Sequence, residues 1–507
     1  MKRYVSFVLT IVIMLTCTLP MVAAQEQCSC GFNPVIYVGA LGSAPIYENY
    51  GTAQEKVLFR PDAGPLVKSA IRLLAPHIPE AVSGNYDGFA DALIQLINDN
   101  FGNLALDENG NSKDNVYSIR NMPSSAAHGV DISYGFGYDL RLDPVEHADA
   151  LHLVIQRLKQ LTGHSKVQLK ASSMGGVVTM AYLEKYGTDD IETIIFQNCP
   201  ILGTAVAGEL FCKKVEVNKN ALLNYALDAI PSLKQDLLQG FLYGLATGLD
   251  DIGMWTSLVG VADKLIINMK DKVYAECLIP IFGTFLGLWS FVPDEYYETA
   301  KSIMVDEEAQ AGLVAKMDNY HYNVQCRAKE ILEAANENIK IYNVVGYDIQ
   351  RTPLVTAHKN TSDGTVDTKC ASVGAITAPI GECLPEDYTQ AIPGSINHIS
   401  PLRKIDASTC ALPLQTWFIK DMLHCNTHKG HHKLYELMLT TPEQFTISSF
   451  SEYPQFMQNN IPNECFDEVR SLTPFEVFKN QPNFTNFVIW LRSLIEKILK
   501  AIFAFAG

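Results

Sequence analysis

The stretch KVQLKASSMGGVV, residues 166–178, decides the fold. Its first residues are typical of a short buried strand, and residues 175–186 are typical of a helix that follows at once. Ala171 and Gly175 flank Ser173 at two residues' distance, where a sharp strand-to-helix turn requires small side chains. The neighbouring Ser172 has Lys170 and Met174 at those positions, which would clash. We therefore predict that Ser173 is a nucleophile on a tight turn between a strand and a helix.

Further strands and helices alternate around this turn. Short apolar runs at 35–38, 131–134, 193–196 and 340–345 predict strands, and residues 147–161 have helical periodicity. Such alternation is typical of the α/β class, with a mostly parallel sheet and helices on both faces. We assign residues 25–204 and 336–430 to this core.

Residues 205–335 differ from the core because they are long, helical and markedly apolar. We predict that they form a large helical cap inserted over the ligand-binding end of the sheet, where a substrate pocket commonly lies. The alternative is that their apolar side chains only pack the helices of the insertion against one another. Residues 431–507 are read as a C-terminal extension.

The composition narrows the function. A chain of 507 residues with 48% apolar content can bury a large core, and its net charge of −16 argues against nucleic acid as a partner. Residues 1–24 have a basic start, an apolar stretch and a small-residue end, which predicts a cleaved signal peptide. The alternative is an uncleaved anchor helix. We expect a secreted or extracytoplasmic protein that can associate with the cell surface.

The cysteines fit an exported chain. Of the twelve cysteines, only Cys17 precedes the predicted cleavage point, which leaves eleven, an odd number. Export favours disulfides, with at least one thiol unpaired within the chain. The C-x-C pair Cys28 and Cys30 is a weak signal for a metal or redox site, so disulfide partners elsewhere are favoured. We expect neither a cofactor nor a metal ion.

A nucleophilic serine needs a base and an orienting acid, which follow it in the chain order Ser, Asp or Glu, His in this type of fold. Asp363 lies in the tight turn of residues 362–366 and is the predicted acid, with Asp348 and Asp367 as alternatives. His398 lies in a loop further on and is the predicted base.

Other histidines fit the role of base less well. His358 precedes Asp363 and so has the wrong order. A polar stretch holds a cluster that lacks a clear metal-ligand spacing and is expected to be solvated: His424, His428, His431 and His432.

The developing negative charge on the substrate needs two N–H donors, called the oxyanion hole. The residue after the nucleophile, Met174, supplies one of them in such turns. The second is predicted to be the N–H of Ala40, in the loop that follows the first strand. Gly39 and Gly42 let that loop approach a substrate closely.

Taken together, these motifs resemble the lecithin:cholesterol acyltransferase family, and in particular its secreted, bacterial-type members. The family's opening turn is matched by GALGS at 39–43, its Y-D-W-R signature by YDLR at 138–141, and its A-H-S-M-G elbow by ASSMG at 171–175. Its D-G-T-V acid loop is matched at 363–366, and its late histidine by His398. The chain departs from the family pattern in having valine for proline at 38, leucine for tryptophan at 140 and serine for histidine at 172.

The resemblance implies an α/β-hydrolase fold with a cap, and acyl transfer from a lipid ester to water or an alcohol. A short-chain esterase, a peptidase, and a non-catalytic surface protein that keeps the fold are the alternatives. Residues 484–507 are predicted to form an apolar helix with a narrow polar stripe, which can lie on a membrane surface or dock on its own domain.

Overall fold

A mostly parallel eight-stranded sheet organises the computed structural model, which describes Cys28 and residues 30–60, 63–229, 236–251, 253–351, 353–471, 473–480 and 484–506. The strand order is β15-β14-β13-β8-β7-β6-β1-β5. Every neighbouring pair is parallel except β14 and β15, which confirms the predicted α/β class. The strands are β1 (Val35–Val38), β5 (Ser133–Phe136), β6 (Val167–Ser172), β7 (Ile191–Gln197), β8 (Lys340–Tyr347), β13 (Thr416–Lys420), β14 (Phe456–Asn460) and β15 (Cys465–Asp467).

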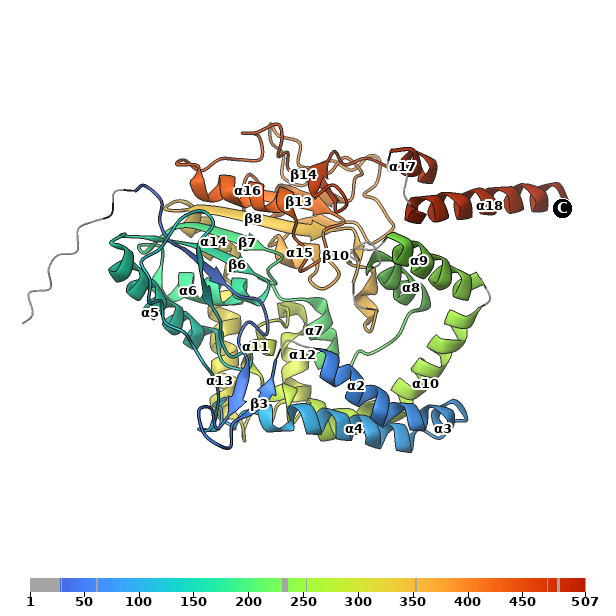
Figure 1. Cartoon of the computed structure of the whole chain (residues 1–507), viewed down its shortest axis with the longest axis horizontal. Coiled ribbons are helices and arrows are strands. Elements are labelled where there is room, and N and C mark those ends of the chain that lie inside the picture. Colours follow the sequence, from blue (N-terminus) through green and yellow to red (C-terminus); the bar gives the residue numbers. More distant parts are fainter. Residues whose placement is uncertain are drawn as a thin grey trace, which may run out of the picture.

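Alternate residues of the central strands enter two different cores, because successive side chains of a strand point to opposite faces. Ile194 and Phe196 of β7 belong to one apolar cluster, and Ile195 between them belongs to the other. The first cluster is covered by α5 (Pro144–Thr162), α6 (Met174–Tyr186) and α14 (Ala328–Asn336), and the second by α16 (Lys429–Thr440). Figure 1 shows α5 and α6 below the sheet and α16 above it.

The predicted helix at 147–161 is confirmed and is longer than expected. Asp143 caps the start of α5 by accepting a hydrogen bond from the Val145 N–H, and Pro144 begins the helix. Gly163 ends it in the left-handed conformation, at φ 71°. The strand expected at 131–134 is instead β5, two residues later along the chain.

The described part of the segment between β7 and β8 is mostly helical. Its elements are α7 (Ala205–Phe211), α8 (Lys219–Ala229), α9 (Asp236–Asp251), α10 (Met254–Val273), α11 (Leu286–Trp289), α12 (Asp294–Met304), α13 (Ala311–Tyr320) and α14, with short 3-10 and π turns between them. The last helix, α14, packs on α6 and β8, so it belongs to the layer that covers the sheet. The others remain candidates for a cap.

An arm of helices lies beside the sheet. It contains α8, α9 and α10 together with α2 (Ala63–Leu74), α3 (Ile78–Val82) and α4 (Asp87–Phe101), and α10 packs on α3 and α4. In Figure 1, the arrows of β8 and β13 point toward the side where α8 and α9 lie. The carboxyl ends of the parallel strands therefore face this arm.

Two parts of the C-terminal region pack on different parts of the fold. The strands β14 and β15 extend the main sheet and α16 covers it, so the core continues well past residue 430. The later helices α17 (Pro474–Asn480) and α18 (Phe484–Ala506) pack on each other, and α18 packs on α9. Figure 1 shows α18 projecting away from the body. Among the described helices, none is both long and apolar enough to cross a membrane.

Three smaller sheets complete the fold. They comprise β2 (Ile46–Glu48), β3 (Lys56–Phe59) and β4 (Val116–Ser118); β9 (Ile349–Gln350) with β10 (Thr361–Ser362); and β11 (Ile376–Thr377) with β12 (Ile405–Asp406). The predicted signal peptide, residues 1–24, lies outside the described residues. Each cysteine that the structure describes is free, so the expected disulfides do not form among them.

Candidate active site

Ser173 sits on a strained turn between β6 and α6. Its φ of 52° and ψ of −125° are unfavourable for a residue with a side chain, and such strain gathers at functional sites. The turn is closely packed, because a Cβ at Gly175 would lie 2.1 Å from the Val38 carbonyl oxygen. A Cβ at Gly176 would lie 2.3 Å from the Cys199 Cβ. The predicted small-residue elbow is confirmed in its geometry.

A continuous chain of hydrogen bonds joins Ser173 to a histidine and a carboxylate. The His424 Nε2 lies 2.8 Å from the Ser173 Oγ, and its Nδ1 lies 2.7 Å from the Asp363 Oδ2. Asp363 is fully buried, and the other two side chains are almost so. This is the geometry of a serine, a base and an orienting acid, in the chain order Ser, Asp, His.

Asp363 is held by its own turn. Its Oδ1 accepts hydrogen bonds from the N–H groups of Thr365 and Val366, at 2.9 and 2.8 Å. Gly364 has a φ of 94°, which lets the turn fold back on the carboxylate. One carboxylate oxygen is thus occupied by the backbone, and the other is directed at His424. The structure thus places Asp363, the predicted acid, beside His424 and not beside His398.

The carboxylate also sets the charge balance of His424. Burial lowers the pKa of His424, but the negative charge and the hydrogen bond of Asp363 raise it more, so the net pKa is above the usual imidazole value. Asp363 therefore stabilises the imidazolium that forms when His424 takes a proton. A bound Nδ1–H also leaves Nε2 as the atom that faces the serine.

The structure does not bring His398 to Ser173, so the predicted pairing of these two residues is wrong. Its Nδ1 lies 2.8 Å from the Oε1 of Gln455, and its backbone N–H donates to Gln390. Gln455 directly precedes β14, which runs parallel to β13, and it also donates to the Thr416 carbonyl at the start of β13. His398 therefore lies at the amino edge of the sheet, whereas Ser173 follows the carboxyl end of β6.

Sequence reasoning missed His424 because it lies beside three other histidines. A usable signal was nevertheless present: β13 is an apolar strand ending at Lys420, and the fourth residue after it is His424. The carboxyl ends of parallel strands meet at one edge of the sheet, so a histidine there can reach a serine at the end of β6. The expectation of a solvated cluster is wrong for His428 and His431, which are buried.

Asn198 is a positioning residue that the sequence did not single out. It follows β7 with a φ of 49°, and its Oδ1 accepts a hydrogen bond from the Gly346 N–H at 2.7 Å. Its Nδ2 donates to the His424 carbonyl oxygen at 3.2 Å. The side chain thus ties β8 to the loop that carries the base.

The predicted oxyanion donors follow two adjacent strands, β1 and β6, at their carboxyl ends. Val38 pairs with Ala171 in the sheet, so Ala40 and Ser173 each lie two residues beyond a paired position. Ala40 borders an open hollow of about 300 Å³. Met174 is the first residue of α6, where a helix leaves N–H groups without partners in the helix itself.

Tyr138 sets the direction of one of these donors. Its hydroxyl donates to the Gly39 carbonyl oxygen at 2.7 Å. The carbonyl and the N–H of a trans peptide point in opposite directions, so the N–H of Ala40 points away from Tyr138. Arg141 is fully buried and makes two hydrogen bonds to Asp139, at 2.9 and 2.7 Å. The YDLR motif therefore braces the loop after β1.

The two alternative acids have other partners. Asp367 pairs with the buried Arg351 at 2.7 Å, and Asp348 pairs with Lys404 at 3.0 Å. His358, which has the wrong order, lies 3.7 Å from Glu216.

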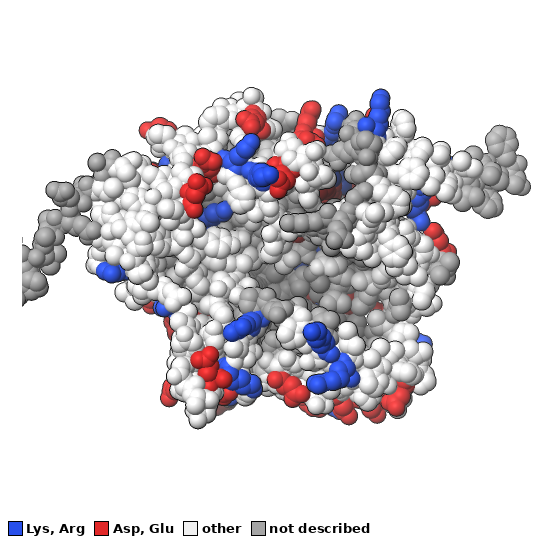
Figure 2. All heavy atoms as spheres, in the orientation of Figure 1, with Lys and Arg blue, Asp and Glu red and all other residues white. Residues whose placement is uncertain are grey.

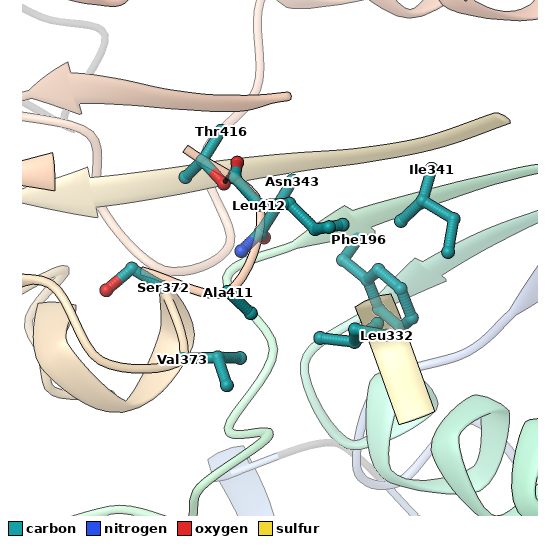
Figure 3. Close-up of a pocket in the computed structure, with 9 residues that line it drawn as sticks. All are labelled: Phe196, Leu332, Ile341, Asn343, Ser372, Val373, Ala411, Leu412 and Thr416. Carbon is teal, nitrogen blue, oxygen red and sulfur yellow. Dashed lines mark hydrogen bonds between the residues drawn. The ribbon is translucent and has the colours of Figure 1, made fainter. Parts of the chain in front are cut away.

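A gap beneath the sheet is a packing defect rather than a binding site. Its lining residues face one another in Figure 3 and come from β7, β8, α14, β13 and two loops. It leaves no room for even a water molecule, and it contains no member of the hydrogen-bonded chain at Ser173.

Comparisons with known proteins add little to this geometry. No protein-family profile matches the chain, and no curated protein matches it. One solved structure that it resembles is an alanine-to-valine mutant of a meta-cleavage product hydrolase, at 12% identity and a TM-score of 0.14. The match covers 41% of this chain and 55% of that hydrolase.

Proposed function

We propose that this chain is a serine hydrolase of the α/β-hydrolase type, which cleaves or transfers the acyl group of a carboxylic ester. The observation that carries the proposal is the Ser173–His424–Asp363 relay on a strained strand-to-helix turn. A buried ion pair alone would not require a serine at a positive φ, and a structural turn would not require a base within 2.8 Å of its hydroxyl.

In the proposed reaction, His424 takes the proton of the Ser173 hydroxyl as the oxygen attacks the ester carbonyl. The N–H groups of Ala40 and Met174 hold the oxyanion. The tetrahedral intermediate collapses, the protonated His424 gives its proton to the leaving alkoxide, and an acyl-enzyme remains. Water or an alcohol, deprotonated by His424, then releases the acyl group and restores the serine.

Exposed apolar helices support a lipid ester as the substrate class. Leu237, Phe241 and Leu245 lie four residues apart on α9 and are 73%, 63% and 46% exposed. The helix that packs on α9 is also apolar at its surface, with exposed residues Phe484, Phe487, Leu491, Leu494, Ile495 and Ile498. Apolar patches of this kind mark membrane or ligand surfaces.

These helices suit contact with a lipid surface rather than insertion across it. Arg492 of α18 makes two hydrogen bonds of 2.9 Å to Asp251 at the end of α9, which joins the two helices. On the face in Figure 2, lysine and arginine lie interspersed with acidic residues instead of forming one basic patch. We infer that binding depends on apolar contact more than on anionic headgroups. An exported location, proposed from residues 1–24, would bring the chain to such surfaces.

The decisive test is labelling with a fluorophosphonate, which reacts with activated serines. Wild type should label, and Ser173→Ala should not. Ser172→Ala is the matched control, because it changes the neighbouring buried serine and should keep the label. Folded wild type that fails to label, with and without detergent to open the cap, would refute the activated serine.

Substrate class can be tested with nitrophenyl esters of increasing chain length and with peptide substrates. A lipid esterase should prefer long acyl chains and gain rate when vesicles or micelles are added. A preference for acetyl and butyryl esters would instead identify a short-chain esterase. Cleavage of peptides alone would identify a peptidase.

A further inference from the structure

Two cysteines and two histidines lie together at the amino ends of the strands, whereas Ser173 lies at the carboxyl ends. Cys28 and Cys30 precede β1, His128 precedes β5, and His164 lies between α5 and β6. These strands are neighbours in the sheet order β6-β1-β5, and all run in the same direction. The four side chains thus gather at the amino ends of three adjacent strands, although the chain separates them by up to 136 residues, from 28 to 164.

The potential ligand atoms lie close to the separations of a tetrahedral metal site. The Cys30 Sγ is 3.2 Å from the His128 Nε2 and 3.3 Å from the His164 Nε2. The Cys28 Sγ is 3.9 Å from the His128 Nε2, and all four atoms lie within 4.8 Å of one another. Zinc–sulfur and zinc–nitrogen bonds of about 2.3 and 2.0 Å give tetrahedron edges of about 3.3–3.8 Å.

The hydrogen bonds around the histidines leave both Nε2 atoms as bare acceptors. The His128 Nδ1 lies 2.8 Å from the Ala126 carbonyl oxygen, which can only accept, so Nδ1 carries the proton. The His164 Nδ1 lies 2.9 Å from the Asn33 Oδ1. The amide orientation of Asn33 is set by Glu192, whose Oε2 accepts from the Asn33 Nδ2 at 2.7 Å.

Two unprotonated Nε2 atoms therefore face each other at 2.9 Å. In neutral imidazoles this contact sets one lone pair against another and is repulsive. A cation between them removes the repulsion. Outer hydrogen bonds of this kind, from Nδ1 to a carbonyl or amide oxygen, are what orient histidine ligands in metal sites.

We propose that Cys28, Cys30, His128 and His164 bind a structural zinc ion. Two thiolates and two imidazoles form the Cys2His2 set of closed, four-coordinate zinc sites, with no position left for substrate. The ion joins the start of the described chain to the loops before β5 and β6, beside a backbone hydrogen bond from Cys28 to Gly163. It replaces the disulfides that we expected for Cys28 and Cys30.

A second group of potential metal ligands, Asp294, His321 and Cys326, is less well suited to a metal ion. It offers three ligand atoms instead of four, and no two histidine nitrogens oppose each other in it, because the His321 Nε2 lies 3.1 Å from the Asp294 Oδ1. Asp294 is also 79% exposed at its side chain.

The test is the metal content of the full chain, purified without chelator in buffer containing zinc. Wild type should retain about one zinc per chain after desalting, and Cys30→Ser and His128→Ala should lose it. Cys383→Ser is the matched control, since Cys383 is an exposed, free cysteine away from the cluster. Wild type without zinc, or zinc retained by both cluster variants, would overturn the proposal.

Two measurements keep the test decisive if the variants fold poorly. Cobalt added to chelator-treated wild type should produce tetrahedral d–d bands and thiolate-to-cobalt charge-transfer absorption, and zinc should remove both. Alkylation of the denatured wild type under non-reducing conditions should modify Cys28 and Cys30, because zinc thiolates are not oxidised. A disulfide involving either cysteine would overturn the proposal.

Discussion

The carboxyl ends and the amino ends of the strands in the central sheet each bring together residues from distant parts of the chain. The two groups of residues suit different chemistry. At the carboxyl ends of the strands, Ser173, His424 and Asp363 form the hydrogen-bonded series on which the proposed hydrolase rests. At the amino ends, two cysteines and two histidines form the cluster for which we propose a zinc ion. The backbone is strained at Ser173 at the carboxyl ends, and the Nε2 atoms of His128 and His164 oppose each other at the amino ends. A parallel sheet thus offers two separate assembly points, because all its strands begin at one edge and end at the other.

The largest effect should come from removing the base. His424→Ala should lower kcat by roughly 10⁶-fold, because members of such a relay act as a unit. His398→Ala is the control and should leave kcat almost unchanged if the protein folds. Ester hydrolysis by both variants checks this, and an equal loss in His398→Ala would contradict the assignment. Zinc content should be unaffected in His424→Ala.

A smaller loss should follow Asp363→Asn. An amide in place of the carboxylate cannot stabilise the imidazolium and favours the wrong tautomer of His424, so kcat should fall by roughly 10⁴-fold. The measurement is kcat with a nitrophenyl ester, with thermal melting to verify folding. Asp348→Asn is the control at one of the alternative acids. Activity that survives Asp363→Asn but not Asp348→Asn would assign the role of the acid to Asp348.

At the opposite edge, Asn33→Ala should weaken zinc binding by roughly 10–100-fold, because Asn33 orients His164 without touching the metal. Competition with a chromophoric chelator measures this affinity. Fluorophosphonate labelling of Ser173 should persist in the zinc-loaded variant, since the sheet separates the two sites. Unchanged affinity would show that the Nδ1 hydrogen bond of His164 does not prepare the site.

The mildest perturbation is pH. A base must be unprotonated, so kcat/KM should be constant above the pKa of His424 and fall about tenfold per unit below it. Asp363 raises that pKa, so the break should lie above the usual imidazole value of about 6.5. A pH–rate profile checks the position, and a break below that value would contradict the charge balance.

The raised pKa of His424 affects the stability of the fold in the opposite direction from its effect on activity. A raised pKa in the folded state means that protonated His424 favours folding. This contribution is fully present below the unfolded pKa and is lost as the pH rises through the folded pKa. Chemical denaturation across this range should therefore show the protein losing the His424 contribution where it gains activity. In His424→Gln this part of the pH dependence should disappear.

Local motifs predicted the parts of the site that depend on nearby residues. The turn around Ser173 needs small neighbours at 171 and 175, and that requirement is written in adjacent positions. The turn around Asp363 is likewise local, since its carboxylate is bound by the next residues along the chain. The apolar runs predicted the strands, because each strand buried on both faces must be apolar along its length.

Contacts between distant segments were not predictable in this way. The choice between His398 and His424 depends on which loop leaves the carboxyl end of a strand, and both histidines follow Asp363 in the chain. The metal cluster has no local spacing beyond C-x-C, because its other two members lie 98 and 134 residues after Cys30. Strand order alone brings them together.

The sequence by itself determined the α/β class and the two tight turns that carry Ser173 and Asp363, because strand periodicity and turn chemistry act over a few residues. Only the tertiary structure decided which histidine lies beside Ser173 and that Cys28 and Cys30 face two imidazoles. The physical reason is that parallel pairing sets the positions of strand ends in space. The spacing of residues along the chain does not encode which of those ends become neighbours.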